Sequence, residues 1–406
     1  MKFSFAILLA LFAISTFAKE PLKVFVLIGQ SNMEGHGHVR VLDYLGDDPK
    51  TRPLLNEIKN EDGSFKPIKD TWISYLTSLD GKVNRPINGQ LMAGYGSQFR
   101  RDLSEPGEKI GPELGFGITM QSAVDEPILI IKAAWGGKSL SVDFRSPSSG
   151  PYEQTEANAR KFETEEKRQA LKENTGIRYR ETIDHVRTVL KDIKSVYPDY
   201  DPAQGYELAG MVWFQGWNDL VDSSTYPNRS ESGGYAKYGE WMANFIRDAR
   251  KDLKAPDMPF VIGVMGVSGA LETMEERHRK NHGNFREAMA APSTMLEFKG
   301  NVVAIQTAPF WDVDLAAIDT KRNEMRGKNH SLKTKNKNHE NADGKMTPDD
   351  IKNFMADFEK KLFTREDIDL EARGKSNAGY HYLGSVKTMT LIGKAFAEAL
   401  INLEKK

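Results

Sequence analysis

Five short, nearly continuous apolar runs recur along the chain, and no other feature constrains its fold as strongly. They cover residues 24–28, 128–133, 208–214, 260–265 and 302–307. Short apolar runs of this kind are typical of strands that are buried on both faces of a sheet. Because helical patterns separate them, the sequence predicts an α/β fold with a central five-stranded parallel sheet covered by helices on both faces.

The helices expected around these strands follow an apolar pattern of helical period. They are predicted at Pro112–Ala123, Ile177–Val196, Tyr235–Leu253, Asn284–Lys299 and Val386–Leu403. In an open parallel sheet, ligands bind at the carboxyl ends of the strands. The residues that directly follow each apolar run are therefore the first candidates for a functional site.

Three stretches interrupt this alternation. Two are highly charged and are predicted to be helical insertions, near residues 151–176 and 321–373. Residues 41–108 form a long, turn-rich excursion, which we expect to fold over a site as a lid.

Residues 339–350, within the second insertion, resemble a calcium-binding loop. His339 stands at the first ligand position and Asp350 at the last. The favoured alternative is a turn at Asp343-Gly344, followed by a helix that Thr347 caps and Pro348 begins. The sequence therefore predicts no metal site here.

The first 18 residues have the pattern of a secretory signal peptide. Lys2 precedes an apolar stretch, and Thr16-Phe17-Ala18 provides a cleavage site. We therefore expect a secreted or periplasmic protein.

Composition narrows the possible partners and chemistries. Cysteine is absent, which excludes a thiol nucleophile, a lipoprotein anchor and thiolate metal sites. The formal net charge of −1 gives no electrostatic reason to expect nucleic acid as a partner, or a membrane after signal cleavage. The sequence leaves the oligomeric state open.

Ser31 follows the first apolar run and Gly29, and it precedes Asn32. At the carboxyl end of a strand, its Oγ would face the ligand crevice and its own N–H would point at a developing oxyanion. The alternative is a turn serine that caps the next helix, which is the commoner role of a lone serine in this setting. Other residues decide between the two.

Neutral donors follow the second and third runs. The third run ends in "MVWFQGWNDL", in which the side-chain amides of Gln215 and Asn218 would donate to an oxyanion or, equally well, satisfy loop backbone groups. The second ends in "AAWGGKSL", in which Gly136 and Gly137 allow backbone N–H groups to approach a ligand closely.

His381 stands in "SNAGYHYLGS", just before the last predicted helix. The aromatic neighbours Tyr380 and Tyr382 indicate partial burial, whereas the other histidines, His36 among them, lie in polar stretches typical of exposed residues. His381 is therefore the candidate general base for Ser31.

Together these motifs resemble those of the SGNH-hydrolase superfamily. The sequence carries "GQSNM" after the first run, "WGGKS" after the second, "FQGWND" after the third and a late "YHYLGS". More narrowly, the chain is similar to the sialate O-acetylesterase and carbohydrate esterase family six group, which is acetyl xylan esterase-like. The resemblance implies a three-layer α/β/α flavodoxin-like fold in one domain over residues 19–406, and hydrolysis of acetyl esters on carbohydrate through an acyl-enzyme.

The resemblance also implies roles for individual residues. Ser31 is the expected nucleophile and His381 the base, and the oxyanion hole combines the N–H groups of Ser31 and Gly137 with the side chain of Gln215. No metal or organic cofactor is expected. The residues expected to bind substrate are Gln30, Asn32, Glu113, Trp217 and Asn218.

The sequence departs from the family pattern at two positions, and these leave open which acid orients His381. Ala378 stands where many superfamily members have an aspartate, and Trp217 stands where relatives often have a glutamate. Asp219 is the first candidate for the acid and Glu113 the second, and a Ser–His dyad steered by a backbone carbonyl is the third possibility.

Two other functions remain as alternatives. Trp217 in place of the glutamate favours a carbohydrate-binding protein that has lost turnover. The other is a hydrolase acting on a sulfate or lipid ester, although the lack of a large apolar stretch argues against lipid.

Overall fold

The computed structural model describes residues 19–80, 84–98, 107–334 and 339–405. The predicted signal peptide, residues 1–18, lies outside the described residues. Among the helices of the described ranges, none combines the length and the apolar character that crossing a membrane requires.

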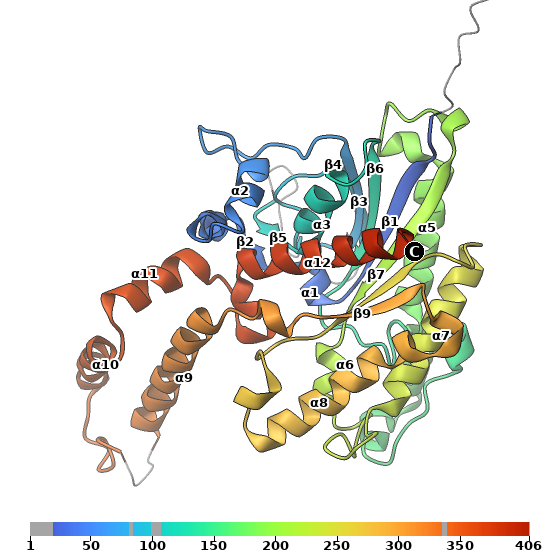
Figure 1. Cartoon of the computed structure of the whole chain (residues 1–406). Coiled ribbons are helices and arrows are strands. Elements are labelled where there is room, and N and C mark those ends of the chain that lie inside the picture. Colours follow the sequence, from blue (N-terminus) through green and yellow to red (C-terminus); the bar gives the residue numbers. More distant parts are fainter. Residues whose placement is uncertain (1–18, 81–83, 99–106, 335–338, 406) are drawn as a thin grey trace, which may run out of the picture.

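The predicted α/β fold with a central, mostly parallel sheet is confirmed (Figure 1). The five apolar runs form β1 (Leu22–Gly29), β6 (Ile128–Ala134), β7 (Tyr206–Phe214), β8 (Phe260–Val264) and β9 (Val302–Gln306). They pair in parallel, and the order across the sheet is β4-β3-β6-β1-β7-β8-β9.

The predicted number of strands was wrong, because the described sheet has seven. β3 (Thr71–Ser78) pairs in parallel with β6, and β4 (Asn84–Gln90) runs antiparallel to β3 at the edge. Both lie within residues 41–108, which we expected to form a lid. Polar residues break the apolar pattern of β3, yet Ser74 is fully buried because Asn88 and His185 satisfy its hydroxyl.

Helices cover both faces of the sheet. α3 (Pro112–Gln121) and α12 (Val386–Glu404) lie on one face, and α5 (Ile177–Lys191), α7 (Ala236–Asp252) and α8 (Glu276–Ala290) on the other. α3 and α12 pack backbone to backbone, because a Cβ on Gly115 would lie 2.0 Å from the carbonyl oxygen of Thr390 and one on Gly393 1.9 Å from that of Pro112. Only glycine permits this approach.

The remaining described elements are short or belong to the insertions. A second sheet consists of β2 (Gly37–His38) and β5 (Lys109–Ile110). The other helices are α1 (Ser31–Glu34), α2 (Arg52–Ile58), α4 (Glu165–Asn174), α6 (Trp217–Val221), α9 (Val313–Lys333), α10 (Pro348–Leu362) and α11 (Arg365–Gly374). Both charged insertions are thus helical, and α9, α10 and α11 project away from the sheet (Figure 1).

The start of α10 matches the favoured alternative to a calcium loop. Thr347 caps the helix, Pro348 opens it, and the Thr347 backbone N–H donates to the Asp350 carboxylate. The Asp350 carboxylate also accepts from the Thr347 hydroxyl. This carboxylate is therefore used by a capping box.

A buried ion pair joins β6 to α3. The Lys132 and Glu113 side chains are fully buried, and Lys132 Nζ lies 2.7 Å from Glu113 Oε2. The same ammonium donates to the backbone carbonyls of Glu34 and Tyr95. Burial raises the pKa of Glu113 and lowers that of Lys132, and the attraction between the two opposes both shifts. All three donors of the ammonium therefore have acceptors.

We expect Glu113→Leu to destabilise the protein by about 3–5 kcal/mol, because it leaves a buried ammonium without its counter-charge. The free energy of unfolding is measured in urea. Glu398→Leu is the matched control, because it removes the exposed pair of Lys394 and Glu398 on α12 and is expected to cost less than about 1 kcal/mol. Equal losses in the two variants would contradict this role for the buried pair.

Candidate active site

The nucleophile candidate Ser31 stands where β1 gives way to a helix. β1 ends at Gly29, whose Cβ would lie 2.1 Å from the carbonyl oxygen of Phe214 in β7. Glycine at this position therefore allows β1 to approach β7 closely, and α1 begins at Ser31. The first N–H groups of a helix have no acceptor within it. The Ser31 backbone N–H is thus available to a ligand.

A cavity of about 440 Å³ opens at this edge of the sheet. The sequence-predicted residues that line it are Ser31, Gly137, Trp217, Asn218 and His381. The others do not line it and are almost completely buried: Gln30, Asn32, Glu113, Gln215 and Asp219. The prediction that Gln30, Asn32 and Glu113 bind substrate is therefore not supported by the structure.

His381 lies in a 3₁₀ turn, Gly379–Gly384, that precedes α12. Its Nδ1 lies 3.0 Å from Asn377 Oδ1, and the Ala378 backbone N–H donates to the same oxygen. Because an amide oxygen only accepts, Nδ1 carries the proton and Nε2 is left as the acceptor. The orienting group of His381 is thus a neutral amide.

The two acids considered for this orienting role lie elsewhere. Asp219 is fully buried, and its carboxylate accepts from the backbone N–H groups of Leu140 and Ser141 and from the side chains of Gln215 and Tyr226. Burial raises its pKa, and these hydrogen bonds oppose the shift. Asp219 therefore anchors the loop that follows β6, which corrects the prediction that it assists His381.

Glu113, the second candidate, is held by Lys132 at 2.7 Å and by the Gly111 backbone N–H at 2.8 Å. The structure therefore does not place it against His381 either. The signal for Asn377 was weak but present, since it stands directly before Ala378, the position where an aspartate was expected.

Gln215 is not presented to the cavity. Its Nε2 donates to Gln30 Oε1, to the Lys138 carbonyl and to Asp219. The structure thus contradicts its predicted place in the oxyanion hole, because its donors are already used by buried neighbours.

Asn218 offers an amide where Gln215 does not. Gln30 Nε2 donates to Asn218 Oδ1 at 3.0 Å, and Asn218 lines the cavity. This bond fixes the amide so that Nδ2, its donor end, is left for a ligand; Nδ2 makes no hydrogen bond to the part of the chain that is described. Gly137 also lines the cavity, with a positive φ of 71° that favours glycine.

Several cavity residues escaped the sequence analysis, His36 and Glu34 among them. His36 stacks on His381 with 3.9 Å between ring centroids and 3° between planes, and its Nε2 lies 3.8 Å from Glu34 Oε2. Glu34 is buried and accepts from the Ser97 hydroxyl. The expectation that His36 is exposed was wrong, because "EGHG" follows the nucleophile helix directly and remains inside the site.

The environment of His381 keeps its imidazole neutral. Burial lowers the pKa of His381 to about 3, and the charges of His36 and Lys109 act in the same direction. A neutral imidazole with a free Nε2 can take a proton. The site thus combines a hydroxyl, a neutral base and nearby N–H donors.

Aromatic side chains form the rim. Trp217 and Tyr380 lie 5.8 Å apart between ring centroids, and Tyr380 is 45% exposed. Trp213 is fully buried in the core, as its place within a strand predicts. The Tyr380 carbonyl accepts from Asn32 Nδ2 at 3.2 Å, so Asn32 ties the His381 turn to the nucleophile helix.

Residues 21–309 match the model of the family described as "Carbohydrate esterase, sialic acid-specific acetylesterase". The matched region contains Ser31, Gly137 and Asn218. The chain belongs to this family. It is a carbohydrate O-acetylesterase, and acetylated carbohydrate is its class of substrate.

Similar solved structures come from several sources. A protein from Arabidopsis thaliana is 16% identical, with 71% of this esterase and 86% of that chain covered and a TM-score of 0.37. A carbohydrate acetylesterase from Xanthomonas citri is 14% identical, with 70% and 49% covered and a TM-score of 0.34. NanS is 14% identical, with 71% and 78% covered and a TM-score of 0.39. No curated protein matches the esterase in sequence.

We expect alanine substitution of Asp219 to lower protein stability and that of Asn377 to lower kcat. Asp219→Ala removes the acceptor of the buried Leu140 N–H, Ser141 N–H and Tyr226 hydroxyl and should destabilise the esterase by about 1–3 kcal/mol or more. Asn377→Ala removes a group beside His381 and should lower kcat by about tenfold or more with little loss of stability. Urea unfolding and steady-state kinetics on an acetyl ester separate the two effects. An Asn377→Ala variant with the parent kcat would exclude an orienting role.

Proposed function

We propose that the chain is an exported serine esterase that removes O-acetyl groups from carbohydrate by Ser–His catalysis through an acyl-enzyme. The observation that carries the proposal is that Ser31 and His381 line one cavity, with the Nδ1 of His381 held by Asn377. The pattern of residues 1–18 supports export.

Each step assigns a group to a task. Ser31 Oγ attacks the acetyl carbonyl while its proton passes to His381 Nε2. The tetrahedral oxyanion accepts hydrogen bonds from the N–H groups of Ser31 and Gly137 and from Asn218 Nδ2. The ester C–O bond then breaks, and the proton on Nε2 passes to the departing sugar oxygen. Water, deprotonated by the same nitrogen, hydrolyses the acetyl-serine and restores the enzyme.

Asn377 orients His381, the task that an acid performs in many serine hydrolases. An amide oxygen fixes the tautomer and the ring orientation of His381, although it stabilises the imidazolium less than a carboxylate would. The low pKa of His381 makes protonation of the base costly. The Glu34 carboxylate, whose Oε2 lies 3.8 Å from His36 Nε2, supplies a negative charge beside the two stacked rings.

The first test is hydrolysis of p-nitrophenyl acetate by the mature protein and three variants. Ser31→Ala and His381→Ala should lose nearly all activity, and Asn218→Ala should fall by about 10²–10³-fold in kcat because one oxyanion donor is lost. Circular dichroism checks that each variant is folded.

Parent-level rates in Ser31→Ala would refute serine catalysis. A parent no faster than buffer on this ester and on acetylated glycans would favour the alternative of a binding protein. Trp217 at the cavity rim would then be a sugar-stacking residue without chemistry beside it.

The pH dependence of the esterase is also fixed by His381. Because its pKa is lowered and the base must be neutral, the acid limb of kcat/KM should lie well below pH 6.5. His36→Ala admits solvent and removes a neighbouring charge, so this limb should move to higher pH. His278→Ala changes an exposed histidine on α8 and serves as the control. A limb that stays in place in His36→Ala would contradict the role of the ring stack.

A further inference from the structure

A second cavity, of about 780 Å³, adjoins the active site. It lies between α9, α11 and the turn that carries His381, and Tyr380 lines both cavities. α9 and α11 follow residue 309, where the match to the family ends. Nothing in the family assignment therefore accounts for this space.

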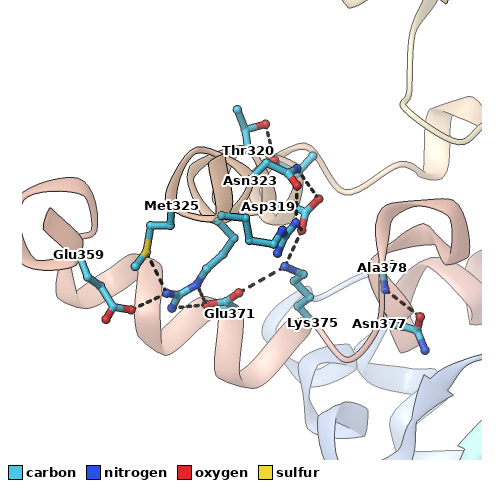
Figure 2. Close-up of polar contacts among 12 residues, drawn as sticks. Asp319, Thr320, Asn323, Met325, Glu359, Glu371, Lys375, Asn377 and Ala378 are labelled. Atoms are coloured by element: carbon cyan, nitrogen blue, oxygen red, sulfur yellow. Dashed lines mark hydrogen bonds and ion pairs between the residues drawn. The ribbon is translucent and has the colours of Figure 1, made fainter. Parts of the chain in front are cut away.

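The helices around the second cavity are held together by ion pairs (Figure 2). Arg322 on α9 reaches Glu359 on α10 and, at 2.7 Å, Glu371 on α11. Lys375 Nζ, beyond the end of α11, lies 2.7 Å from Asp319 and 3.3 Å from Glu371. The side chains of Lys375 and Asp319 are mostly shielded from solvent. A wall built in this way is preformed rather than assembled around a ligand.

The wall combines apolar groups with charged ones, and Lys375 and Arg326 both lie near the Asp319 carboxylate. Its cations are Arg40, Arg326 and Lys375, and its anions are Asp319 and Glu371. Lys375 is paired with both anions, and Arg40 donates to the backbone carbonyls of Ala372 and Lys375. Such a surface offers donors and acceptors to hydroxyl groups and has no strong field to attract a polyanion.

Two residues connect the cavities. Tyr380 projects from the turn beside Trp217, and aromatic faces of this kind pack against the apolar faces of sugar rings. Asn377 lines the second cavity while its Oδ1 holds His381.

A third cavity, of about 490 Å³, shares Asp319 and Gly379 with the second. Binding space thus continues along the His381 turn, well beyond one acetylated sugar.

We propose that the second cavity is a glycan subsite. It binds sugar residues of a neutral oligosaccharide whose acetylated residue occupies the Ser31 cavity, and the chain crosses between the two over Tyr380. This inference rests on the proposed function, and it identifies the substrate as a neutral chain rather than a free acetylated monosaccharide. Contact with Asn377 also places a bound chain against the residue that orients His381.

The test compares substrates of two lengths. Values of kcat/KM are measured for singly acetylated xylose and mannose and for acetylated xylohexaose and mannohexaose. Asn323→Trp fills the second cavity from the exposed face of α9, and Asn353→Trp adds the same side chain to the exposed face of α10, away from the cavity. Rates on p-nitrophenyl acetate normalise each variant.

The parent should prefer at least one hexamer over its monosaccharide by about tenfold or more, as expected for added sugar contacts. Asn323→Trp should lose this preference and Asn353→Trp should keep it. Equal kcat/KM for both lengths, or the same loss in both variants, would overturn the subsite while leaving the esterase proposal intact.

A second measurement does not depend on catalysis. Unacetylated xylohexaose, mannohexaose and an oligogalacturonide are titrated calorimetrically into the parent and both variants. Binding of a neutral hexamer that Asn323→Trp abolishes and Asn353→Trp retains supports the subsite even in a protein that hydrolyses no ester. No binding of either neutral hexamer, or tighter binding of the oligogalacturonide, overturns it.

Discussion

One buried ammonium sets the relative positions of the elements that form the site. Lys132 extends from β6, and its three donors reach Glu113 on α3, the carbonyl of Glu34 at the end of the nucleophile helix, and the carbonyl of Tyr95. A buried charge tolerates little displacement of its partners, because each lost contact leaves it unsolvated. The end of α1 is therefore held against the sheet, and Ser31, at the start of α1, lines the cavity.

Neutral amides perform much of the positioning inside the site. Gln30 receives hydrogen bonds from Gln215 and from the backbone of Gly216, and it holds Asn218 through its own Nε2. Asn377 does the same for His381. The one carboxylate in this network, Asp219, is surrounded by donors and anchors the loop after β6. Asn377 thus orients His381 without a carboxylate, and burial, together with the charges of His36 and Lys109, lowers the pKa of His381.

The sequence predicted what depends on local pattern and missed what depends on distant neighbours. Apolar runs predicted β1, β6, β7, β8 and β9, and motif position brought Ser31 and His381 to one cavity. β3 was missed because its buried hydroxyls are satisfied by partners on other elements. Asp219 and Gln215 were given catalytic tasks because the family resemblance matches them to motif positions, and a motif does not reveal which way a side chain turns.

The close packing of α3 against α12 has a consequence for how this enzyme can diversify. Gly115 and Gly393 bring the two backbones into direct contact, so α12 is fixed to α3 in the core. The His381 turn directly precedes α12, and Asn32 Nδ2 donates to the Tyr380 carbonyl within it. Parts of the helical insertion that do not contact this turn can therefore change in length or side chains while α12 keeps the turn beside the nucleophile helix.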